Sequence, residues 1–459
     1  MLETTDVVIV GAGPVGAMLA AELRLHGIGV VVLERLTRPT GLSKAHALHA
    51  RTIQTLDRRG LLDRFVSVAG KGPRAGRAQF GGLEVLDRTA VEADVPMMLG
   101  VPQAETERIL LDHAVSLGAD VRRGQEVVGI DGATVETVSG HRIAAEFVVG
   151  ADGGRSTVRK LAGIDFAGTD ATIAGLLGDV TVEDPRAIPF GWHRTERGWV
   201  ISMVRPDGAG RVFALTFDGP HADRDAPLGM AEFRSTVERI LGRPVSMRDP
   251  RWLSRFGDGC RQAVEYRRGT VLLVGDAAHV HFPAGGQGLN LGLQDAVNLG
   301  WKLAATINGT AADGLLDTYH AERHPVGERV LRNARTQVVL MDPDPRFDPL
   351  REVFTELMLL DETNRHLVSM LAGLDVHYAP GDHPAIGHYA PALPGLAKRQ
   401  RGGQWVYVGP EPLDGAEWLA GQEQMLIRPD GYVAWAGEQG MAEALRRWVT
   451  SFPATNRHR

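Results

Sequence analysis

The 459-residue sequence predicts an α/β fold in which a domain built on a parallel sheet is interrupted by an antiparallel sheet. Two strand–turn–helix patterns, one near the N-terminus and one near residue 271, predict the parallel part. Between them, short apolar runs alternate with Pro and Gly turns, which is typical of antiparallel strands. A largely helical stretch and a short α/β tail complete the predicted fold.

The composition narrows the class of protein. Hydrophobic residues make up 44% and charged residues 23%, as in globular proteins with a large core. The net charge is −6 and no Lys/Arg block occurs, so we expect no nucleic-acid partner. Apolar runs stay shorter than the roughly 18 residues of a membrane span, and the N-terminal residues lack a signal-peptide pattern. The single cysteine, Cys260, excludes a dithiol pair, so we expect a reducing, cytoplasmic location.

The N-terminal glycine motif is the most informative local pattern. An apolar strand over residues 6–10 runs into a glycine turn and a helix, and a second strand over residues 30–33 ends at Glu34. The glycines of the turn are Gly11, Gly13 and Gly16. This arrangement is typical of a Rossmann-like dinucleotide site, where the glycines admit a pyrophosphate and the acid accepts ribose hydrogen bonds. The alternative is an ordinary strand–helix turn with incidental glycines.

A second glycine-rich stretch spans residues 271–305. An apolar strand over 271–274 stops at Gly275-Asp276, a loop with three glycines follows, and helical spacing begins at Leu289. The helix N-terminus would favour an anion, and the glycines would let a flat or phosphorylated ligand approach. An ordinary αβ turn remains the alternative. The neighbouring His279 and His281 lack further ligands at metal-binding spacing, so we interpret them as packing or loop-ordering residues.

Two further segments extend this pattern, and a third does not. Asp152-Gly153 follows an apolar strand over residues 147–150, and a helix opens near Val101-Pro-Gln. The glycines between Gly70 and Gly76 do not follow a strand pattern, so we interpret that stretch as a loop.

Together these motifs resemble the class A flavoprotein monooxygenases, which are single-component FAD-dependent aromatic hydroxylases. The resemblance covers nearly the whole chain. Five segments are similar to the subgroup that hydroxylates aromatic polyketides: 101–108, 275–279, 283–290, 295–302 and 319–325. Residues 364–367 and 426–431 look closest to rifampicin monooxygenases.

We therefore expect four structural parts. Residues 1–168 and 262–330 would form a discontinuous FAD-binding domain, and residues 169–261 an inserted antiparallel β-sheet domain for the substrate. Residues 331–395 would be a helical connector. The resemblance implies that residues 396–459 form a short thioredoxin-like α/β tail.

The resemblance also implies a set of cofactor-binding residues. Those expected near the pyrophosphate and the adenosine ribose are Gly11, Gly13, Gly16, Glu34 and Arg35. Those expected near the ribityl chain and the phosphates are Gln103, Arg108, Gly275 and Asp276. Those expected at the flavin ring are Pro283, Gly286, Gly288, Leu289 and Asn290. Asp152 and Gly153 match a family element associated with both FAD and pyridine nucleotide.

The chemistry that the resemblance implies uses bound FAD, with NADPH or NADH as a transient co-substrate. Reduced flavin would react with O2 to a flavin hydroperoxide, which transfers oxygen to a large aromatic molecule, either rifamycin-like or a polycyclic phenol or quinone. The flavin carries this chemistry, so we expect no catalytic protein nucleophile and no metal. Trp192 and Trp199 would either line the substrate cavity or belong to the sheet core.

One departure from the family keeps an alternative open. Where relatives commonly carry an arginine associated with flavin positioning, this chain has His46, which is shorter and can be neutral near pH 7. The alternative is a protein that sequesters a flavin or another ligand without efficient turnover. Flavin-dependent halogenases are disfavoured because Trp-x-Trp-x-Ile-Pro is absent, and disulfide reductases need a cysteine pair.

Overall fold

The computed structural model describes residues 2–70, 76–378 and 381–451, so most of the loop predicted between Gly70 and Gly76 lies outside the described residues. Its central sheet has six strands in the order β20-β21-β12-β2-β3-β8. The strands are β2 (Val7–Val10), β3 (Val30–Glu34), β8 (Asp120–Arg123), β12 (Phe147–Gly150), β20 (Arg267–Arg268) and β21 (Val271–Leu273). All neighbouring pairs are parallel except β20 with β21. The inner strands are apolar runs buried on both faces, as parallel strands require.

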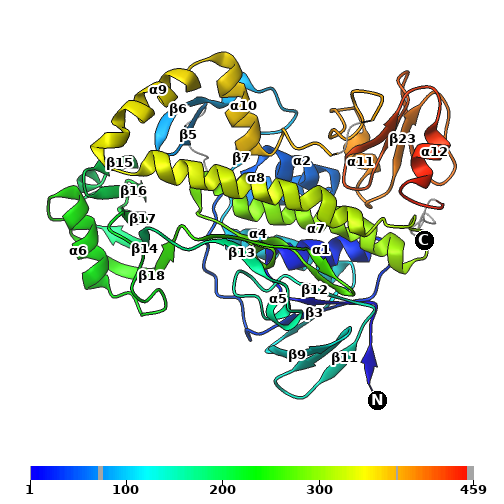
Figure 1. The fold of residues 1–459 in the computed structure, drawn as a ribbon, viewed down its shortest axis with the longest axis horizontal. Helices are drawn as coiled ribbons and strands as arrows, with labels where there is room; N and C mark the ends of the chain where they lie inside the picture. Colours follow the sequence, from blue (N-terminus) through cyan, green and yellow to red (C-terminus); the bar gives the residue numbers. More distant parts are fainter. Residues whose placement is uncertain (1, 71–75, 379–380, 452–459) are drawn as a thin grey trace.

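Helices cover this sheet (Figure 1). Helix α1 (Pro14–Leu25) packs against α4 (Gln103–Ser116) and α7 (Gln287–Ile307), and α8 (Asp317–Met341) runs along α7. Helix α5 (Thr157–Leu161) follows β12. A four-stranded side sheet, in the order β1-β11-β10-β9, flanks the central sheet. Its strands are β1 (Glu3–Thr4), β9 (Val127–Asp131), β10 (Thr134–Thr137) and β11 (Arg142–Ala144).

A five-stranded antiparallel sheet lies at the opposite end of the molecule from the C-terminal segment (Figure 1). Its strands are β14 (Ala174–Val182), β15 (Gly191–Thr195), β16 (Gly198–Val204), β17 (Ala209–Thr216) and β18 (Met247–Gly257). Because side chains alternate along a strand, the sheet has two different faces. Aliphatic residues such as Val200 and Val212 pack under α6 (Met230–Leu241) on one face. The other face carries Trp199, Phe213 and Phe256.

Short elements connect these parts. They are α2 (Ala50–Arg58), α3 (Leu62–Val68), β4 (Leu48–His49), β5 (Arg77–Phe80), β6 (Leu83–Asp87), β7 (Met98–Leu99), β13 (Phe166–Thr169), β19 (Cys260–Ala263) and β22 (His279–Val280). Two-stranded sheets pair β4 with β7 and β5 with β6, and β13, β19 and β22 form a three-stranded sheet.

The C-terminal part begins with α9 (Asp348–Met358) and α10 (Asp361–Ala372) and ends in a small sheet (Figure 1). The sheet order is β24-β23-β25-β26, and only β23 with β24 is parallel. These strands are β23 (Val406–Gly409), β24 (Glu417–Ala420), β25 (Met425–Ile427) and β26 (Val433–Ala436). The short helices α11 (Leu396–Arg399) and α12 (Met441–Arg446) flank them. The tail therefore combines this small sheet with two short helices.

The structure confirms the mixed α/β fold. The strand predicted at residues 271–274 is β21, and the helix predicted from Leu289 begins two residues earlier, at Gln287. The helix predicted after Val101 is α4. Within the described residues, none of the helices is both long enough and apolar enough to cross a membrane.

Candidate active site

The glycine turn after β2 is shaped by close backbone contacts. At Gly11, where φ is +109°, a Cβ would lie 2.4 Å from the carbonyl oxygen of Ala151. At Gly16 a Cβ would lie 2.0 Å from the carbonyl oxygen of Gly11. A Cβ on Gly13, by contrast, would meet no described heavy atom within 4 Å. Gly11 and Gly16 are thus needed for packing, whereas Gly13 opens a path to the backbone for a ligand.

Glu34 ties this turn to the end of β3. Its carboxylate accepts the N–H of Ala12 (3.0 Å) and the N–H of Leu36 (2.9 Å). An ionised carboxylate has about four acceptor sites, so two remain for a ribose hydroxyl. The neighbouring Arg35 is exposed.

The turn after β21 lies beside the turn after β12. Gly275 has φ +60°, and the exposed Asp276 carboxylate forms no hydrogen bond with any described residue. The Arg159 guanidinium of α5 donates to the carbonyl oxygen of Ala277 (2.8 Å) and to that of Gly154 (3.0 Å). An acceptor without a protein partner at this turn fits a ligand that carries hydroxyl donors.

Asp152 has a local role. Its carboxylate accepts the Ser156 hydroxyl (2.5 Å), the Thr157 N–H (2.7 Å) and the Val158 N–H (3.1 Å), which caps the N-terminus of α5. Gly153, with φ +81°, leaves its Cβ direction open among the described residues. The backbone at Gly153 is therefore more accessible to a ligand than the Asp152 carboxylate.

The loop before α7 combines unusual backbone with an uncapped helix end. Gly285 and Gly286 have φ of +73° and +65°. Within the described part of the chain, no side chain caps α7 at Gly286 and no acid lies in its first turn, and the same holds for α1 at Gly13. The N–H groups at both ends therefore remain for a ligand, and the helix dipoles favour a negative one.

The side chains around this loop differ in burial. Pro283 is exposed and Leu289 is half-buried. A Cβ added to Gly288 would lie 3.3 Å from the Nε2 atom of His281.

Two amide side chains hold the segment that faces this loop. Asn290 accepts the N–H of His49 (2.8 Å) and donates to the carbonyl oxygens of Ala47 (3.1 Å) and Gly286 (3.0 Å). At the other end, Gln103 Oε1 accepts the N–H of Ala45 (3.2 Å), and the Gln103 N–H donates to the Ala45 carbonyl (2.9 Å). Residues 45–49 are thus fixed from both sides.

The structure does not bring Arg108 into this group. Its exposed guanidinium pairs with Glu105 (2.8 Å) and Asp112 (3.1 Å) along α4. The i,i+3 and i,i+4 spacing on the helix explains both pairs. In this structure Arg108 therefore forms surface ion pairs, and its expected role beside the ribityl chain stays a prediction.

His46 lies on the segment held by Asn290 and Gln103. Desolvation by the surrounding chain, followed by the charge of the nearby Arg211, lowers the pKa of its exposed imidazole below its ordinary value. Arg211 is itself paired with Asp179 (2.8 Å). The lowered pKa favours the neutral imidazole, which does not replace the permanent charge of an arginine.

The aromatic face of the antiparallel sheet reaches the same loop. Phe282 packs with Phe256, their ring centroids 6.1 Å apart, and Phe256 meets Phe213 edge-on at 6.1 Å. Trp199 is only 3% exposed and its indole N–H donates to the Met341 carbonyl (2.5 Å), so it belongs to the core. Trp192 is partly buried beside it. An apolar aromatic wall therefore stands next to the glycine loop.

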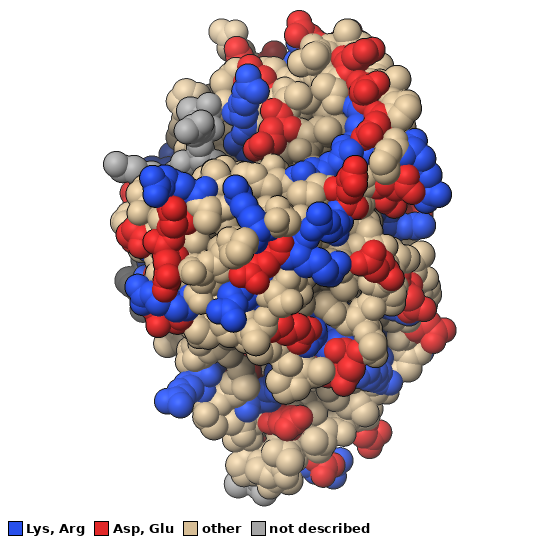
Figure 2. Space-filling model, turned by 90° about the vertical axis from the view of Figure 1, so that its left-hand side faces the viewer, with Lys and Arg blue, Asp and Glu red and all other residues tan. Residues whose placement is uncertain are grey.

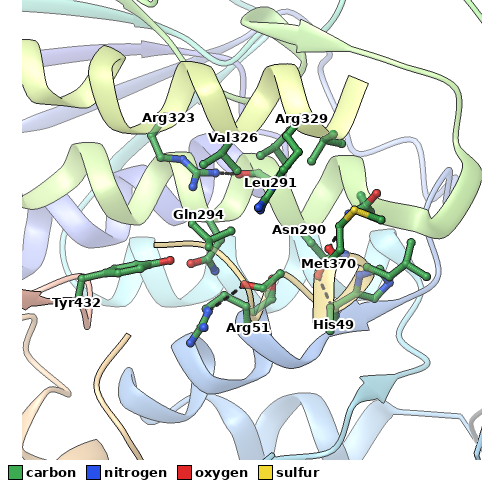
Figure 3. A pocket seen from close by; sticks show the side chains of 17 residues that line it. His49, Arg51, Asn290, Leu291, Gln294, Arg323, Val326, Arg329, Met370 and Tyr432 are labelled. Atoms are coloured by element: carbon green, nitrogen blue, oxygen red, sulfur yellow. Dashed lines mark hydrogen bonds between the residues drawn. The ribbon is translucent and has the colours of Figure 1, made fainter. Parts of the chain in front are cut away.

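A pocket lies behind the Asn290 contact (Figure 3). It lies between α2, α7, α8 and residues 370–376 and is partly open to solvent. Its arginines already have partners: Arg51 donates to the Gly373 carbonyl (3.2 Å) and Arg329 pairs with Asp375 (2.9 Å). His49 lines it, and burial lowers the pKa of that imidazole to about 4.

Sequence reasoning missed the buried ion pairs beneath the site. Asp295 of α7 is fully buried and accepts the His279 Nε2–H (2.6 Å), the Arg323 Nε–H (2.8 Å) and the Gly275 N–H (3.2 Å). The sequence does contain a signal for these ion pairs. It is the presence of charged residues at helix positions where the periodicity predicts burial. The interpretation of His279 as a loop-ordering residue agrees with this contact.

On the surface, charges of both signs are mixed. Figure 2 shows Lys and Arg side chains interspersed with Asp and Glu over the face that it presents. That face therefore has no extended field of one sign.

Comparison with known proteins identifies two family regions. Residues 4–334 match the family described as an FAD binding domain, and residues 395–451 match the one described as the C-terminal region of aromatic-ring hydroxylases. The two matches together span most of the chain.

Three similar proteins illustrate the relationship. The 12-dehydrotetracycline 5-monooxygenase/anhydrotetracycline 6-monooxygenase of Streptomyces rimosus is 43% identical, over 96% of this chain and 98% of its own length. A rifampicin monooxygenase of Streptomyces venezuelae is 41% identical, over 98% and 99%. The solved structure of the OxyS anhydrotetracycline hydroxylase from Streptomyces rimosus has a TM-score of 0.88 at 40% identity, over 97% of this chain and 99% of that chain.

Proposed function

This chain belongs to the FAD-binding family of aromatic-ring hydroxylases, and from that membership we propose that it hydroxylates a large aromatic or polyketide-type antibiotic with electrons from NADPH or NADH. It is an FAD-dependent aromatic monooxygenase. One observation carries the substrate proposal: Phe282 of the glycine loop packs against the aromatic face of the antiparallel sheet. A flat aromatic molecule would therefore find an apolar wall next to the loop.

We assign a task to each part of the chain. Residues 1–168 and 262–330 bind FAD, and residues 169–261 supply the wall against which the substrate packs. Residues 331–395 connect these parts to the C-terminal tail, residues 396–459.

The cofactor residues form two groups. The Gly13 backbone and the first turn of α1 hold the pyrophosphate, while Glu34 accepts a ribose hydroxyl on a free lone pair. Asp276 accepts ribityl hydroxyls, because its carboxylate lacks any other partner among the described residues. The N–H groups of Gly288 and Leu289, at the start of α7, meet the pyrimidine edge of the flavin ring.

When bound, FAD supplies the two-electron chemistry that activates O2 for transfer of one oxygen atom. The chain supplies the electrostatic environment. The uncapped N-terminus of α7 stabilises negative charge on its ligand by about 0.3–1 kcal/mol, and by up to roughly 2 kcal/mol where partly buried. Because these N–H groups are fixed before any ligand binds, they need no reorganisation during the reaction.

The aromatic wall orients the substrate and keeps water out. Phe213 and Phe256 present ring edges and faces that pair with a polycyclic ring system, each contact contributing about 0.5–1.5 kcal/mol beyond area burial. Tetracycline-type and rifamycin-type molecules both offer electron-rich fused rings. Either class therefore satisfies the chemistry of this wall.

For the pyridine nucleotide we propose contact with the backbone at Gly153 rather than with the Asp152 carboxylate. That carboxylate is already occupied by three donors at the start of α5. Gly153 has the positive φ and the open Cβ direction that permit close approach.

His46 favours a second candidate function. The neutral His46 lacks the charge that an arginine would give to flavin or nucleotide, so a protein that sequesters flavin or another ligand without efficient turnover is the alternative.

A single experiment separates the two functions. Purified holoprotein is mixed with NADPH or NADH, O2 and candidate aromatics, and nucleotide oxidation and product mass are followed. Substrate-stimulated oxidation with gain of one oxygen atom supports the hydroxylase. Tight binding of flavin and aromatic without oxygen incorporation supports sequestration.

A further inference from the structure

A continuous buried polar network starts at the Gly275 turn and passes between α7 and α8. Asp295, with 0% exposure, accepts the Gly275 N–H (3.2 Å) and the Arg323 Nε–H (2.8 Å). Arg323 also donates to the carbonyl oxygen of Leu291 (3.2 Å), and Figure 3 shows this side chain reaching from α8 to α7. The turn that carries Asp276 is therefore tied to both helices.

The network continues through Tyr378. The Tyr378 hydroxyl accepts from Arg323 Nη1 (3.4 Å) and from Asn298 Nδ2 (3.3 Å). The same amide nitrogen of Asn298 donates to Glu322 (2.7 Å) and to Asp430 (3.2 Å). Asn298 thus joins the ion pairs under the cofactor turn to a second group of ion pairs. The C-terminal segment, which contains β25 and β26, contributes to this second group.

At the far end, Arg428 lies in the turn between β25 and β26 of that segment. Its guanidinium forms two parallel bonds to the Glu322 carboxylate, 2.7 and 2.8 Å long, and also pairs with Asp430. Lys302 of α7 donates to the same Glu322 (2.7 Å). Bidentate arginine–carboxylate pairs fix orientation as well as distance.

The charges of this network balance. Its carboxylates are Asp295, Glu322 and Asp430, and its cations are Lys302, Arg323 and Arg428. All six side chains are at least nine-tenths buried. Removing one partner of such a set leaves an uncompensated buried charge, so neighbouring elements shift to relieve it.

Helix α7 links this network to both halves of the candidate cofactor site. Asp295, Asn298 and Lys302 are spaced by three and four positions, so they share the face that meets α8. The first turn of the same helix, at Gly288 and Leu289, is the end to which we assign the flavin ring. A displacement of α7 would therefore move that end and the Gly275 turn together.

We propose that Arg428 of the C-terminal segment is a positioning residue for the cofactor, acting through Glu322, Asn298 and Asp295 on the Gly275–Asp276 turn. This inference rests on the proposed FAD site. It gives the segment a role in cofactor affinity that requires neither cysteines nor contact with the flavin.

The test is FAD affinity of the apoprotein, measured by quenching of flavin fluorescence, beside its thermal midpoint and the visible circular dichroism of the bound flavin. Arg428→Met is expected to raise the FAD Kd about tenfold and to alter the visible circular dichroism. Arg428→Lys keeps the charge but loses the bidentate geometry, and is expected to raise the Kd by roughly threefold. The double variant Glu322→Gln/Arg428→Met restores the charge balance and should return the Kd to within about threefold of wild type.

Arg399→Met is the matched control. It removes an arginine of the same segment whose ion pair with Glu417 is exposed, and its Kd should equal that of wild type.

The outcomes are distinguishable. If Arg428→Met or Arg428→Lys lowers the thermal midpoint but leaves the FAD Kd and the visible spectrum unchanged, the segment is structural only and the inference fails. If Arg428→Met does not fold, Arg428→Lys decides by the same criterion. If the wild-type apoprotein itself does not bind FAD, the proposed site fails instead.

Discussion

The side-chain amide of Asn290, in the first turns of α7, holds the backbone of His49, which lies 241 positions earlier in the chain. The Asn290 oxygen accepts the His49 N–H at 2.8 Å, and its nitrogen donates to the carbonyls of Ala47 and Gly286. This contact joins the segment that contains His46 to the glycine loop. The relative position of the two segments therefore depends on one buried side chain.

Replacing this amide should weaken both folding and cofactor binding. Asn290→Ala leaves a backbone N–H and two carbonyls without their partner, which should lower the free energy of unfolding by about 1–3 kcal/mol. We expect the FAD Kd to rise about tenfold. Denaturant titration and flavin fluorescence measure the two effects. Gln294→Ala, which loses a bond to Thr55 one turn later, is the control, and equal FAD affinity in both variants would refute the role of Asn290.

The glycine turn after β2 permits two contrasting predictions, one for Gly13 and one for Gly11. Gly13→Ala adds a methyl group that meets no described atom, at an ordinary φ of −69°, so the apoprotein stability should change by less than about 0.5 kcal/mol. FAD affinity should nevertheless fall at least about tenfold, because the methyl blocks approach to the backbone. Wild-type FAD affinity in Gly13→Ala would mean that the pyrophosphate binds elsewhere.

Gly11→Ala should behave in the opposite way. Its Cβ would lie 2.4 Å from the Ala151 carbonyl oxygen at φ +109°. We expect the free energy of unfolding to fall by roughly 2 kcal/mol or more, whether or not FAD is present. Thermal and denaturant unfolding of the apoprotein measure this effect, and an unchanged midpoint would contradict the packing argument.

The sequence predicts the elements of this site better than their contacts. The strand before Gly11, the acid Glu34 and the helix after the glycine loop follow from local periodicity, because glycine and apolar spacing act within a few residues. Asp295 was not predicted as a site residue because its partners, His279 and Arg323, come from other elements and meet only after packing.

Two predicted contacts depended on the direction of a side chain. Arg108 sits on an amphipathic helix whose register is visible in the sequence, but the register alone does not predict its exposed pairing with Glu105 and Asp112. The motif predicts that Asp152 contacts a ligand, and the structure shows three donors from the start of α5 at its carboxylate. Local capping thus competed with the role inferred from the motif.

The buried neutral His49 should make stability depend on pH. Burial lowers its pKa from 6.5 to about 4 in the folded protein, so between these values the unfolded state binds the proton more readily. Stability is therefore unaffected above about pH 6.5 and falls as the pH drops from there to about 4, by up to about 3 kcal/mol. His49→Gln should flatten this slope in denaturant titrations between these pH values, with the half-buried His193→Gln as the control. An unchanged slope in His49→Gln would contradict the assignment.

Because Arg108 pairs with acids on the protein surface, we expect its removal to have little effect on FAD binding. Arg108→Ala should leave the FAD Kd within about twofold of wild type and change stability by less than about 1 kcal/mol, because exposed ion pairs contribute little. Fluorescence titration with FAD checks this directly. A rise of about tenfold in Kd would show that the guanidinium leaves Glu105 and Asp112 to reach the cofactor.

The most direct test of the proposed hydroxylation is turnover under O2 labelled with the heavy oxygen isotope. FAD-loaded protein is incubated with NADPH or NADH and, separately, with a tetracycline-type and a rifamycin-type aromatic, and the products are analysed by mass spectrometry. We expect substrate-stimulated nucleotide oxidation and a product that contains one labelled oxygen atom. Recovery of unchanged aromatics, with nucleotide oxidation absent or yielding only hydrogen peroxide, would contradict the account.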